Sequence, residues 1–276
     1  YRFRVNVVAL TAGAKKSWQI TCRAIGQEPP ALKNIHAEEL TPLLNEVSQG
    51  LILVSGGTGS GKTTSIAAIV RNRLENAQNS DKVITHESPI EYVYDSIPTK
   101  AKLTQLTVGR DVASFPKGIQ NAARNPPSVI VVGECRDKET LSEAVLATSS
   151  GHLTLMGVQA SGVADTVSRC MRIFDSTRDH LDFLHSLSLV TSQILVPTVS
   201  GTRIALRETL VFSDDVMENL RGLSPEDTRL KINDILSSRR EGFLFDAQKK
   251  FKKGLISLKT LEEIELHTKH LKKRMQ

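Results

Sequence analysis

Residues 56–64, GGTGSGKTT, match the pattern Gly-x4-Gly-Lys-Ser/Thr without a mismatch. Glycines let consecutive backbone N–H groups turn toward one anion. A helix that begins directly after the loop adds its N-terminal donors and the positive end of its dipole. In this pattern the lysine reaches the β- and γ-phosphates and the next hydroxyl binds Mg²⁺. The segment therefore predicts a nucleoside triphosphate site whose binding residues are Gly56, Gly57, Thr58, Gly59, Ser60, Gly61, Lys62, Thr63 and Thr64, with Thr63 as a ligand of Mg²⁺.

Carboxylates follow two apolar runs that read as strands. SVIVVGE ends in Glu134, and THESPIEYVYD contains Glu87 and Glu91. Ligands of open α/β sheets collect at the carboxyl ends of strands, where a carboxylate polarises water or holds Mg²⁺ through a water molecule. We predict both roles for Glu134, although Gly133 stands where an Asp is usual. For Glu87 and Glu91 we expect projection toward the nucleotide, with a solvated loop carboxylate as the alternative.

The segment GHLTLMGVQAS adds two residues that are candidates for a sensor. Gln159 lies near the end of the apolar run and is placed to detect a γ-phosphate by hydrogen bonding. His152 opens the same segment. A single His or Gln is ordinarily structural, so the assignment of these two residues depends on support from elsewhere in the chain.

The elements that must position these groups follow from hydrophobic periodicity. The apolar runs LILVSG, KVITHE, SVIVVGE and LTLMGVQAS alternate with helical sequence, which indicates a parallel α/β sheet. Two alternating stretches near the N-terminus predict strands that are too few to stand alone, and GQEPPALKN is typical of a linker. From about Ser213 the chain is mostly helical. The predicted divisions are 1–25, a truncated N-terminal domain; 26–34, the linker; 35–212, the core; and 213–276, a helical region.

Composition fits a globular protein, with 39% hydrophobic residues, 24% charged residues and three cysteines that form no CxxC motif. The chain begins at Tyr1 rather than Met, so we expect it to start within a longer protein. Residues 246–276 hold nine Lys/Arg against four Asp/Glu and carry most of the net charge of +6. This basic tail suits anionic lipid, nucleic acid or an acidic partner, with a solvated helix face as the alternative. Aromatic residues, at 4%, are few for a platform that stacks single-stranded bases.

Together the segments resemble the secretion-ATPase family, the motors of type IV pili, type II secretion and type IV secretion. GGTGSGKTT is similar to the family's Walker A motif, THESPIEYVY to its Asp box, NPPSVIVVGECRD to its Walker B segment and GHLTLMGVQASGVADT to its His box. YRFRVN is similar to the end of the family's N-terminal PAS-like domain. VGECRD, ASGVADT, LVPTVSGTRIALRETLVF and KKFKKGLIS resemble the ATPases of type IVB secretion and conjugation in particular.

The resemblance implies an α/β fold: a RecA-like P-loop core with a parallel-rich sheet flanked by helices, a partial PAS-like α/β domain and a C-terminal helical region. It implies a homo-hexameric ATPase that uses ATP and Mg²⁺ to power protein or DNA–protein transfer. It also implies a cytoplasmic protein at the inner membrane of a bacterium. The expected partners are inner-membrane components of a secretion or conjugation machine, with a peripheral membrane contact and no direct sequence-specific nucleic-acid binding.

Site roles carry over by position. Glu134 takes the Walker B role, and Glu91, with Glu87 as second candidate, takes the Asp-box role. Arginines that face a neighbouring site act as sensors or fingers in the family, because a guanidinium stays charged and grips phosphate oxygens with two donors. The matching arginines here are Arg2, Arg4 and Arg23 in the N-terminal part and Arg110 and Arg124 in the core.

Departures from the family pattern leave alternatives open. Ser88 stands where the Asp box usually has an acid, His86 replaces an apolar residue, and Gln159 stands where the His box has its second His; His152 is retained. The first hypothesis is a motor ATPase. Ser88 and Gln159 motivate a second, a nucleotide-gated assembly platform that hydrolyses slowly or not at all. A RecA-like nucleic-acid motor is the third; the basic charge allows it, and the scarcity of aromatic residues opposes it.

Overall fold

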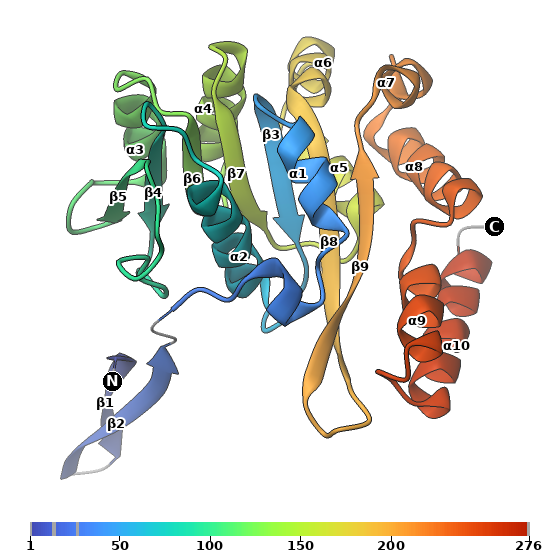
Figure 1. Cartoon of the computed structure of the whole chain (residues 1–276), viewed down its shortest axis with the longest axis horizontal. Helices are drawn as coiled ribbons and strands as arrows, with labels where there is room; N and C mark the ends of the chain where they lie inside the picture. The colour runs from blue at the N-terminus through green and yellow to red at the C-terminus, as the bar shows by residue number, and fades with distance from the viewer. Residues whose placement is uncertain (1, 13–14, 26–27, 275–276) are drawn as a thin grey trace.

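The computed structural model of this chain describes residues 2–12, 15–25 and 28–274 (Figure 1). The N-terminal strands β1 (Arg2–Ala12) and β2 (Lys15–Ile25) form an antiparallel pair, as the alternating pattern predicts. The linker prediction falls partly on residues 26–27, which lie outside the described residues. Its end contains a short 3-10 helix, Leu32–Ile35. The predicted domain boundaries stay predictions.

The core is built on one seven-stranded sheet of order β5-β4-β6-β7-β3-β8-β9. All neighbouring strands run parallel except β8 and β9, which form an antiparallel hairpin at one edge. The predicted α/β fold with a mostly parallel sheet flanked by helices is confirmed. The strands are β3 (Gly50–Ser55), β4 (Lys82–Glu87), β5 (Lys102–Thr107), β6 (Val129–Cys135), β7 (Leu153–Val158), β8 (Leu187–Pro197) and β9 (Arg203–Val211).

Helices cover both faces of this sheet (Figure 1). Side chains alternate along a strand, so Leu51 and Leu53 of β3 face one hydrophobic cluster and Ile52 and Val54 face the other. The second cluster includes α1 (Leu40–Glu46) and α2 (Lys62–Glu75). The first includes α3 (Phe115–Ala123), α4 (Lys138–Ser149), α5 (Val163–Met171), α6 (Thr177–Ser186), α7 (Asp214–Leu220) and α8 (Pro225–Arg239).

The C-terminal helices α9 (Phe243–Lys252) and α10 (Leu258–Arg274) pack against the β8–β9 hairpin in a third apolar cluster. A buried charged contact strengthens this junction. The backbone N–H of Arg207 on β9 donates to the Asp246 carboxylate at 2.7 Å, and Lys250 pairs with the same carboxylate at 2.5 Å. The Arg207 guanidinium donates at 2.9 Å to the carbonyl of His36, which precedes α1. Arg207 thereby links α9, through its backbone, to the segment before α1, through its side chain.

The helical prediction from about Ser213 onward agrees with α7 to α10, but the sequence reading missed three strands. Strand β5 is an edge strand with mixed polarity, and none of its residues is fully buried. Strands β8 and β9 contain Ser, Thr, Gln, Arg and Glu among apolar residues. These polar residues are buried because they bond to the phosphate loop, to α5 and to α9. Among the described helices, none has the length and apolarity required to cross a bilayer.

One histidine inside the sheet should make stability depend on pH. His86 on β4 is fully buried, and its ring packs against Gly118 of α3, where an added Cβ would lie 2.3 Å from the ring. Burial lowers the pKa of His86 from 6.5 to about 4, and the Val131 backbone opposes that shift only in part. The folded protein therefore resists a proton that the unfolded chain accepts.

We predict that His86→Leu removes this pH dependence. Stability from neutral His86 is fully present above pH 6.5 and is lost as the pH falls toward 4, because only the unfolded state gains the proton. The difference in free energy of unfolding between wild type and variant should change by about 2 kcal/mol between pH 7.5 and 5. Urea unfolding at both pH values measures it, with His185→Gln, an exposed histidine, as control. Parallel pH profiles for wild type and His86→Leu would contradict the prediction.

Candidate nucleotide-binding site

The glycine-rich loop, residues 56–61, connects the carboxyl end of β3 to the first turn of α2. Two glycines are required by geometry. Gly61 caps α2 with φ +87°, a left-handed conformation that L side chains rarely adopt. A Cβ on Gly56, at φ +152°, would lie 2.5 Å from the carbonyl oxygen of Gln193. Gly57 and Gly59 face open space, so the turn presents free backbone on its outer side.

Strand β8 holds this loop in place through one buried side-chain amide, that of Gln193. The Gln193 side chain donates to the carbonyl of Ser60 at 2.6 Å and accepts from the Ser65 hydroxyl at 2.6 Å. Gln193 is 1% exposed, so both bonds are shielded from water. The same amide therefore holds the last part of the loop and the first turn of α2 in one fixed geometry.

The predicted phosphate-binding lysine lies in the loop. Lys62 donates to the carbonyls of Gly56 and Gly57, both at 2.9 Å. Partial burial lowers the pKa of Lys62, and the nearby Glu134 carboxylate opposes that shift. A phosphate bound over the loop would therefore have to replace these two carbonyls as the acceptors of the Lys62 ammonium.

Glu134 and Gln159, from neighbouring strands, meet beside the loop. The Gln159 amide donates to Oε1 of Glu134 at 2.9 Å, and Arg136 donates to Oε2 at 2.6 Å. Strand β6 pairs with β7 so that Cys135 lies opposite Val158, which brings the residues beside them together. The sequence motifs predict Glu134 and Gln159 at the site. They do not predict Arg136, which is exposed and lies two residues beyond Glu134.

Glu87 ends β4 and lines a small pocket together with Thr63, Tyr92 and Tyr94. Its carboxylate accepts from Thr85 at 2.8 Å and from Gln105 at 3.1 Å, while burial raises its pKa. Glu91, in the loop after β4, supplies a backbone N–H to Glu87. Glu87, the second candidate for the Asp-box role, is thus the carboxylate that shares a pocket with Thr63.

The neighbouring tyrosine joins this pocket to the first turn of α2. The Tyr92 hydroxyl lies 3.1 Å from Thr64 Oγ1, and the Tyr92 carbonyl accepts from Gln105 at 2.9 Å. Thr64, predicted as a nucleotide-binding residue, therefore holds the loop after β4 rather than pointing into open solvent. Ser88 belongs to that same loop.

Two predicted site residues lie at the opposite edge of the sheet. The backbone of His152 precedes β7 and bonds to Gly50 at the start of β3, while its ring contacts the carbonyl of Pro127. In a parallel sheet the first residues of the strands lie along one edge and the last residues along the opposite edge, where the loop is. For a six-residue strand these two ends are about 20 Å apart. The structure therefore does not bring His152 together with Gln159 and Glu134 within one chain, and its sensor role stays a prediction. Arg124, exposed after α3, lies at this far edge as well, beside Asn125, whose carbonyl bonds Lys82 at the start of β4.

The remaining predicted arginines lie outside the immediate surroundings of the loop. Arg110 follows β5 and pairs with Asp111 through two bonds of 3.0 Å, which lower the pKa of Asp111 to about 2. The Arg110 side chain is 73% exposed, so it remains accessible to another molecule. Arg2, Arg4 and Arg23 lie on the β1–β2 pair, with Arg4 opposite Arg23, and their side chains lie outside the described part of the structure.

The donor set suits a magnesium nucleotide. Mg²⁺ prefers hard oxygen ligands and keeps several waters. The exposed hydroxyl of Thr63 and the carboxylates of Glu87 and Glu134 supply such oxygens around the start of α2. The open space beside Gly57 and Gly59 leaves room for phosphate against the loop. The residues present therefore fit ATP and Mg²⁺, with Mg²⁺ offsetting phosphate charge when bound.

This loop between a parallel strand and a helix, with an acidic residue at the end of a strand two places away, defines a P-loop nucleotide-binding protein. The chain belongs to the type II/IV secretion system protein family, whose model matches residues 2–242. Members with similar sequences are ATPases of secretion systems and pili.

Two curated relatives illustrate the match. The type IV pilus retraction ATPase PilT of Pseudomonas aeruginosa is 31% identical over 223 residues, which cover 80% of this chain and 62% of PilT. A twitching motility protein of Neisseria gonorrhoeae is 32% identical over 241 residues, covering 86% of this chain and 61% of that protein. The chain thus spans about three fifths of the length of these relatives.

Solved structures match the fold closely. The ATPase DotB of Legionella pneumophila superposes with a TM-score of 0.87 and 36% identity, covering 96% of this chain and 73% of DotB. The pilus retraction motor PilT with bound ADP gives a TM-score of 0.79 and 28% identity, covering 94% of this chain and 77% of that one.

We predict that Gln193→Leu destabilises the protein and weakens nucleotide binding. The variant leaves the Ser60 carbonyl and the Ser65 hydroxyl buried without a partner, which costs about 2–5 kcal/mol in free energy of unfolding. Binding of a fluorescent ATP analogue should weaken by about tenfold, because the loop is no longer held.

Thr191→Val is the matched control for Gln193→Leu. Thr191 lies on the same strand and bonds Thr209 at 2.9 Å, away from the loop. It should lower stability while leaving nucleotide affinity unchanged. Equal affinity in Gln193→Leu and Thr191→Val would show that Gln193 does not position the loop.

Proposed function

We propose that this chain is the ATP-hydrolysing part of a secretion motor. The observation that carries the proposal is the convergence, at one edge of the sheet, of Lys62 in the phosphate loop with Glu134 and Gln159. Family membership and the similarity to ATPases of known structure support it. Because the chain covers about three fifths of its curated relatives, the activity of the whole protein is part of the proposal.

Each residue has a defined task in this mechanism. Lys62 leaves the carbonyls of Gly56 and Gly57 for the phosphate oxygens, and backbone N–H groups of the loop share the negative charge. Glu134 orients and activates the attacking water, and Gln159 holds the carboxylate in place. Arg136 must release or rotate with Glu134 for the carboxylate to reach water, because it occupies the second carboxylate oxygen.

The active assembly we propose is a homo-hexamer with nucleotide between subunits. Arg110 is exposed and retains free donors beyond its bond with Asp111. Arg124 lies at the opposite edge of the sheet from the loop of its own subunit, and Arg2, Arg4 and Arg23 lie on the separate β1–β2 pair. Such positions suit arginines that act on a neighbour's phosphates. Hydrolysis would release such a grip and let the ring change shape.

The finer assignment is a type IVB or conjugation-like secretion system that transfers protein or DNA–protein substrates. The 36% identity and TM-score of 0.87 with DotB support it. In this setting the protein is cytoplasmic and bound peripherally at the bacterial inner membrane. Its partners are inner-membrane components of the machine, and direct sequence-specific nucleic-acid binding has no role.

A nucleotide-gated assembly platform is the second candidate. The hydrogen bond from Gln159 to Glu134 favours it, because the amide occupies a carboxylate oxygen that a water molecule would otherwise contact. In a platform, ATP binding closes the ring and recruits partners with little turnover.

We predict that Glu134→Gln lowers ATP turnover by about 100-fold or more, because the amide cannot act as a base. Nucleotide affinity should change by less than about threefold, since Lys62 and the loop are intact. Steady-state phosphate release and analogue binding on the same full-length samples measure both. Glu139→Gln, an exposed acid on α4, is the control. Normal turnover in Glu134→Gln would end the motor assignment.

We predict that turnover per subunit of the full-length protein rises with protein concentration and falls by about 100-fold in Arg110→Ala, because the site needs a neighbour's guanidinium. Phosphate release across a hundredfold range of concentration measures this.

The variant Gln159→His separates the motor from the assembly platform. Tight binding without turnover in wild type, with turnover restored in Gln159→His, would favour the platform and contradict the motor.

A further inference from the structure

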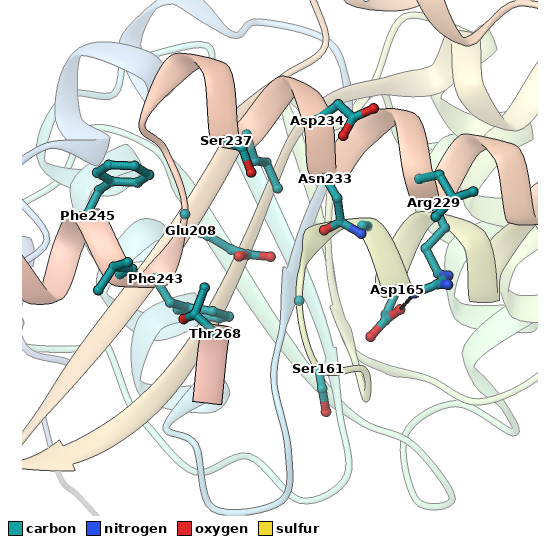
Figure 2. A pocket seen from close by; sticks show the side chains of 16 residues that line it. Ser161, Asp165, Glu208, Arg229, Asn233, Asp234, Ser237, Phe243, Phe245 and Thr268 are labelled. Carbon is teal, nitrogen blue, oxygen red and sulfur yellow. Dashed lines mark ion pairs between the residues drawn. The ribbon is translucent and has the colours of Figure 1, made fainter. Parts of the chain in front are cut away.

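A second cavity, distinct from the phosphate loop, lies between the core and the C-terminal helices (Figure 2). Its volume is about 620 Å³, within the roughly 300–1,000 Å³ of small-molecule sites. Helices α5, α8, α9 and α10 and strand β9 all contribute residues to its wall. Figure 2 shows the Glu208 carboxylate and the Asn233 side chain directed toward its centre, with Ser161 and Asp165 across from them.

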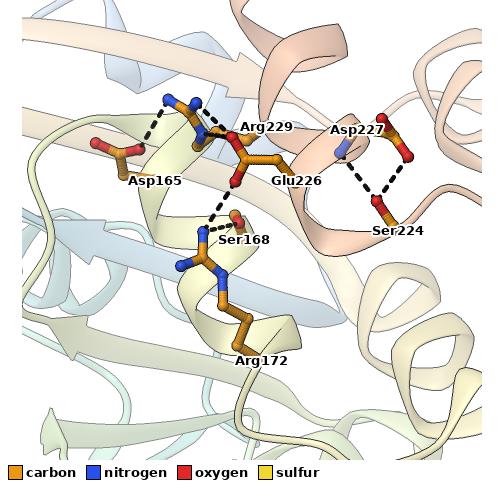
Figure 3. Close-up of polar contacts among 7 residues, drawn as sticks. All are labelled: Asp165, Ser168, Arg172, Ser224, Glu226, Asp227 and Arg229. Carbon is orange, nitrogen blue, oxygen red and sulfur yellow. Dashed lines mark hydrogen bonds and ion pairs between the residues drawn. The ribbon is translucent and has the colours of Figure 1, made fainter.

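The cavity carries an excess of negative charge. Among the side chains that the structure describes, three carboxylates line it, from Asp165, Glu208 and Asp234, against one guanidinium, that of Arg229. That guanidinium is already engaged. It donates to Glu226 at 2.5 and 2.9 Å and lies 3.8 Å from Asp165 (Figure 3). Arg240, whose guanidinium lies 5.5 Å from the centre of the cavity-lining Phe245 ring, is a second cation beside the cavity. Among the described side chains that line the cavity itself, carboxylates still outnumber cations.

Glu208 is the most confined of these carboxylates. It is held at the wall by the backbone N–H groups of Val163, at 2.5 Å, and of Phe243. Burial raises its pKa to about 7, and the charge of Asp165 adds to the shift. A cation in the cavity would reverse that shift, because it would stabilise the charged form.

An aromatic wall completes the chemistry. Phe243 and Phe245 line the cavity beside the carboxylates. The Arg240 guanidinium already lies over the Phe245 ring at 5.5 Å, so a bound cation would share that ring with Arg240 or displace it. Carboxylates beside aromatic faces are the combination that binds organic ammonium and guanidinium groups.

The cavity wall is continuous with the candidate catalytic residues. Ser161 and Gly162 line the cavity, two and three residues after Gln159, which bonds Glu134. The N–H of Gly162 donates to Ser192 at 3.0 Å, and Ser192 precedes the Gln193 that supports the loop. A ligand that shifts residues 161–163 would move both contacts.

We propose that this cavity binds an organic cation bearing ammonium or guanidinium groups, and that its occupancy regulates nucleotide turnover through residues 159–163. The binding is independent of the proposed motor function, and the regulation rests on it. The cation comes either from a free di- or polyamine or from a basic side chain of a second copy of this chain.

Calorimetric titration with agmatine, which carries one group of each kind, tests the binding in the full-length protein. We expect saturable binding that weakens about tenfold in Glu208→Gln and about threefold in Asp234→Asn, an exposed position on α8 where folding is not at risk. Affinity should fall as the pH drops from 8 to 6, because Glu208 takes up a proton. Glu218→Gln on α7, outside the cavity, is the matched control and should bind as wild type does.

Three outcomes would overturn the binding proposal: no binding at millimolar agmatine, equal affinity in Glu208→Gln and wild type, or equal loss in Glu218→Gln. Sedimentation distinguishes the sources. Weaker self-association in Glu208→Gln and in wild type with agmatine identifies a side chain of a second copy, and unchanged self-association identifies a free amine.

Phosphate release with and without agmatine tests the regulation. A change of at least threefold in wild type, absent from Glu208→Gln, supports it. Bound agmatine without any change in an active enzyme would refute the regulation while leaving the binding intact. If wild type binds agmatine but shows no turnover at all, the proposed motor function fails, and the ligand's effect on nucleotide affinity then decides whether the cavity is coupled to the loop.

Discussion

The parallel pairing of the central strands decides where every chemical group of this protein lies. Ser55 at the end of β3 pairs with Val158 at the end of β7, and Cys135 of β6 pairs with Val158 from the other side. The phosphate loop, Glu134 and Gln159 therefore meet at one edge without any long-range signal in the sequence. The same register carries the residues before each strand to the opposite edge, which is why His152 lies far from its predicted partners.

The phosphate loop and the position of Glu134 could be predicted because each depends on a short, local sequence pattern. The glycine spacing and the apolar run before it determine a strand, a loop and a helix with a fixed geometry, and the end of SVIVVGE places Glu134 correctly at the carboxyl edge. Strands β8 and β9 escaped prediction because their buried polar residues break the apolar pattern. Gln193 is the clearest case, since its amide is polar in sequence terms and 1% exposed in the fold. Its role follows from a tertiary contact with Ser60 and Ser65, and a single sequence carries no sign of it.

Charges at the site are already paired within the chain. Lys62 bonds two loop carbonyls, and Glu134 bonds Arg136 and Gln159. Phosphate binding would therefore exchange partners rather than satisfy idle groups, so affinity depends on the difference between two bonded states. The charge of Glu134 acts on the Lys62 ammonium, so a change in the partners of one group alters the electrostatic surroundings of the other.

Helix α8 enters this arrangement through its contact with α5 and the short backbone segment that precedes α5. Asp165 and Ser168 of α5 contact Arg229 and Arg172, and Glu226 of α8 joins the two arginines (Figure 3). Exposed pairs of this kind contribute little stability individually, and their value lies in fixing orientation. Because α5 begins four residues after Gln159, any movement of α8 that displaces the start of α5 must be absorbed between Gln159 and Val163. The N–H groups of Gly162 and Val163 bond Ser192 and Glu208, so these two contacts, one on each strand of the β8–β9 hairpin, are what hold this segment in place against such a movement.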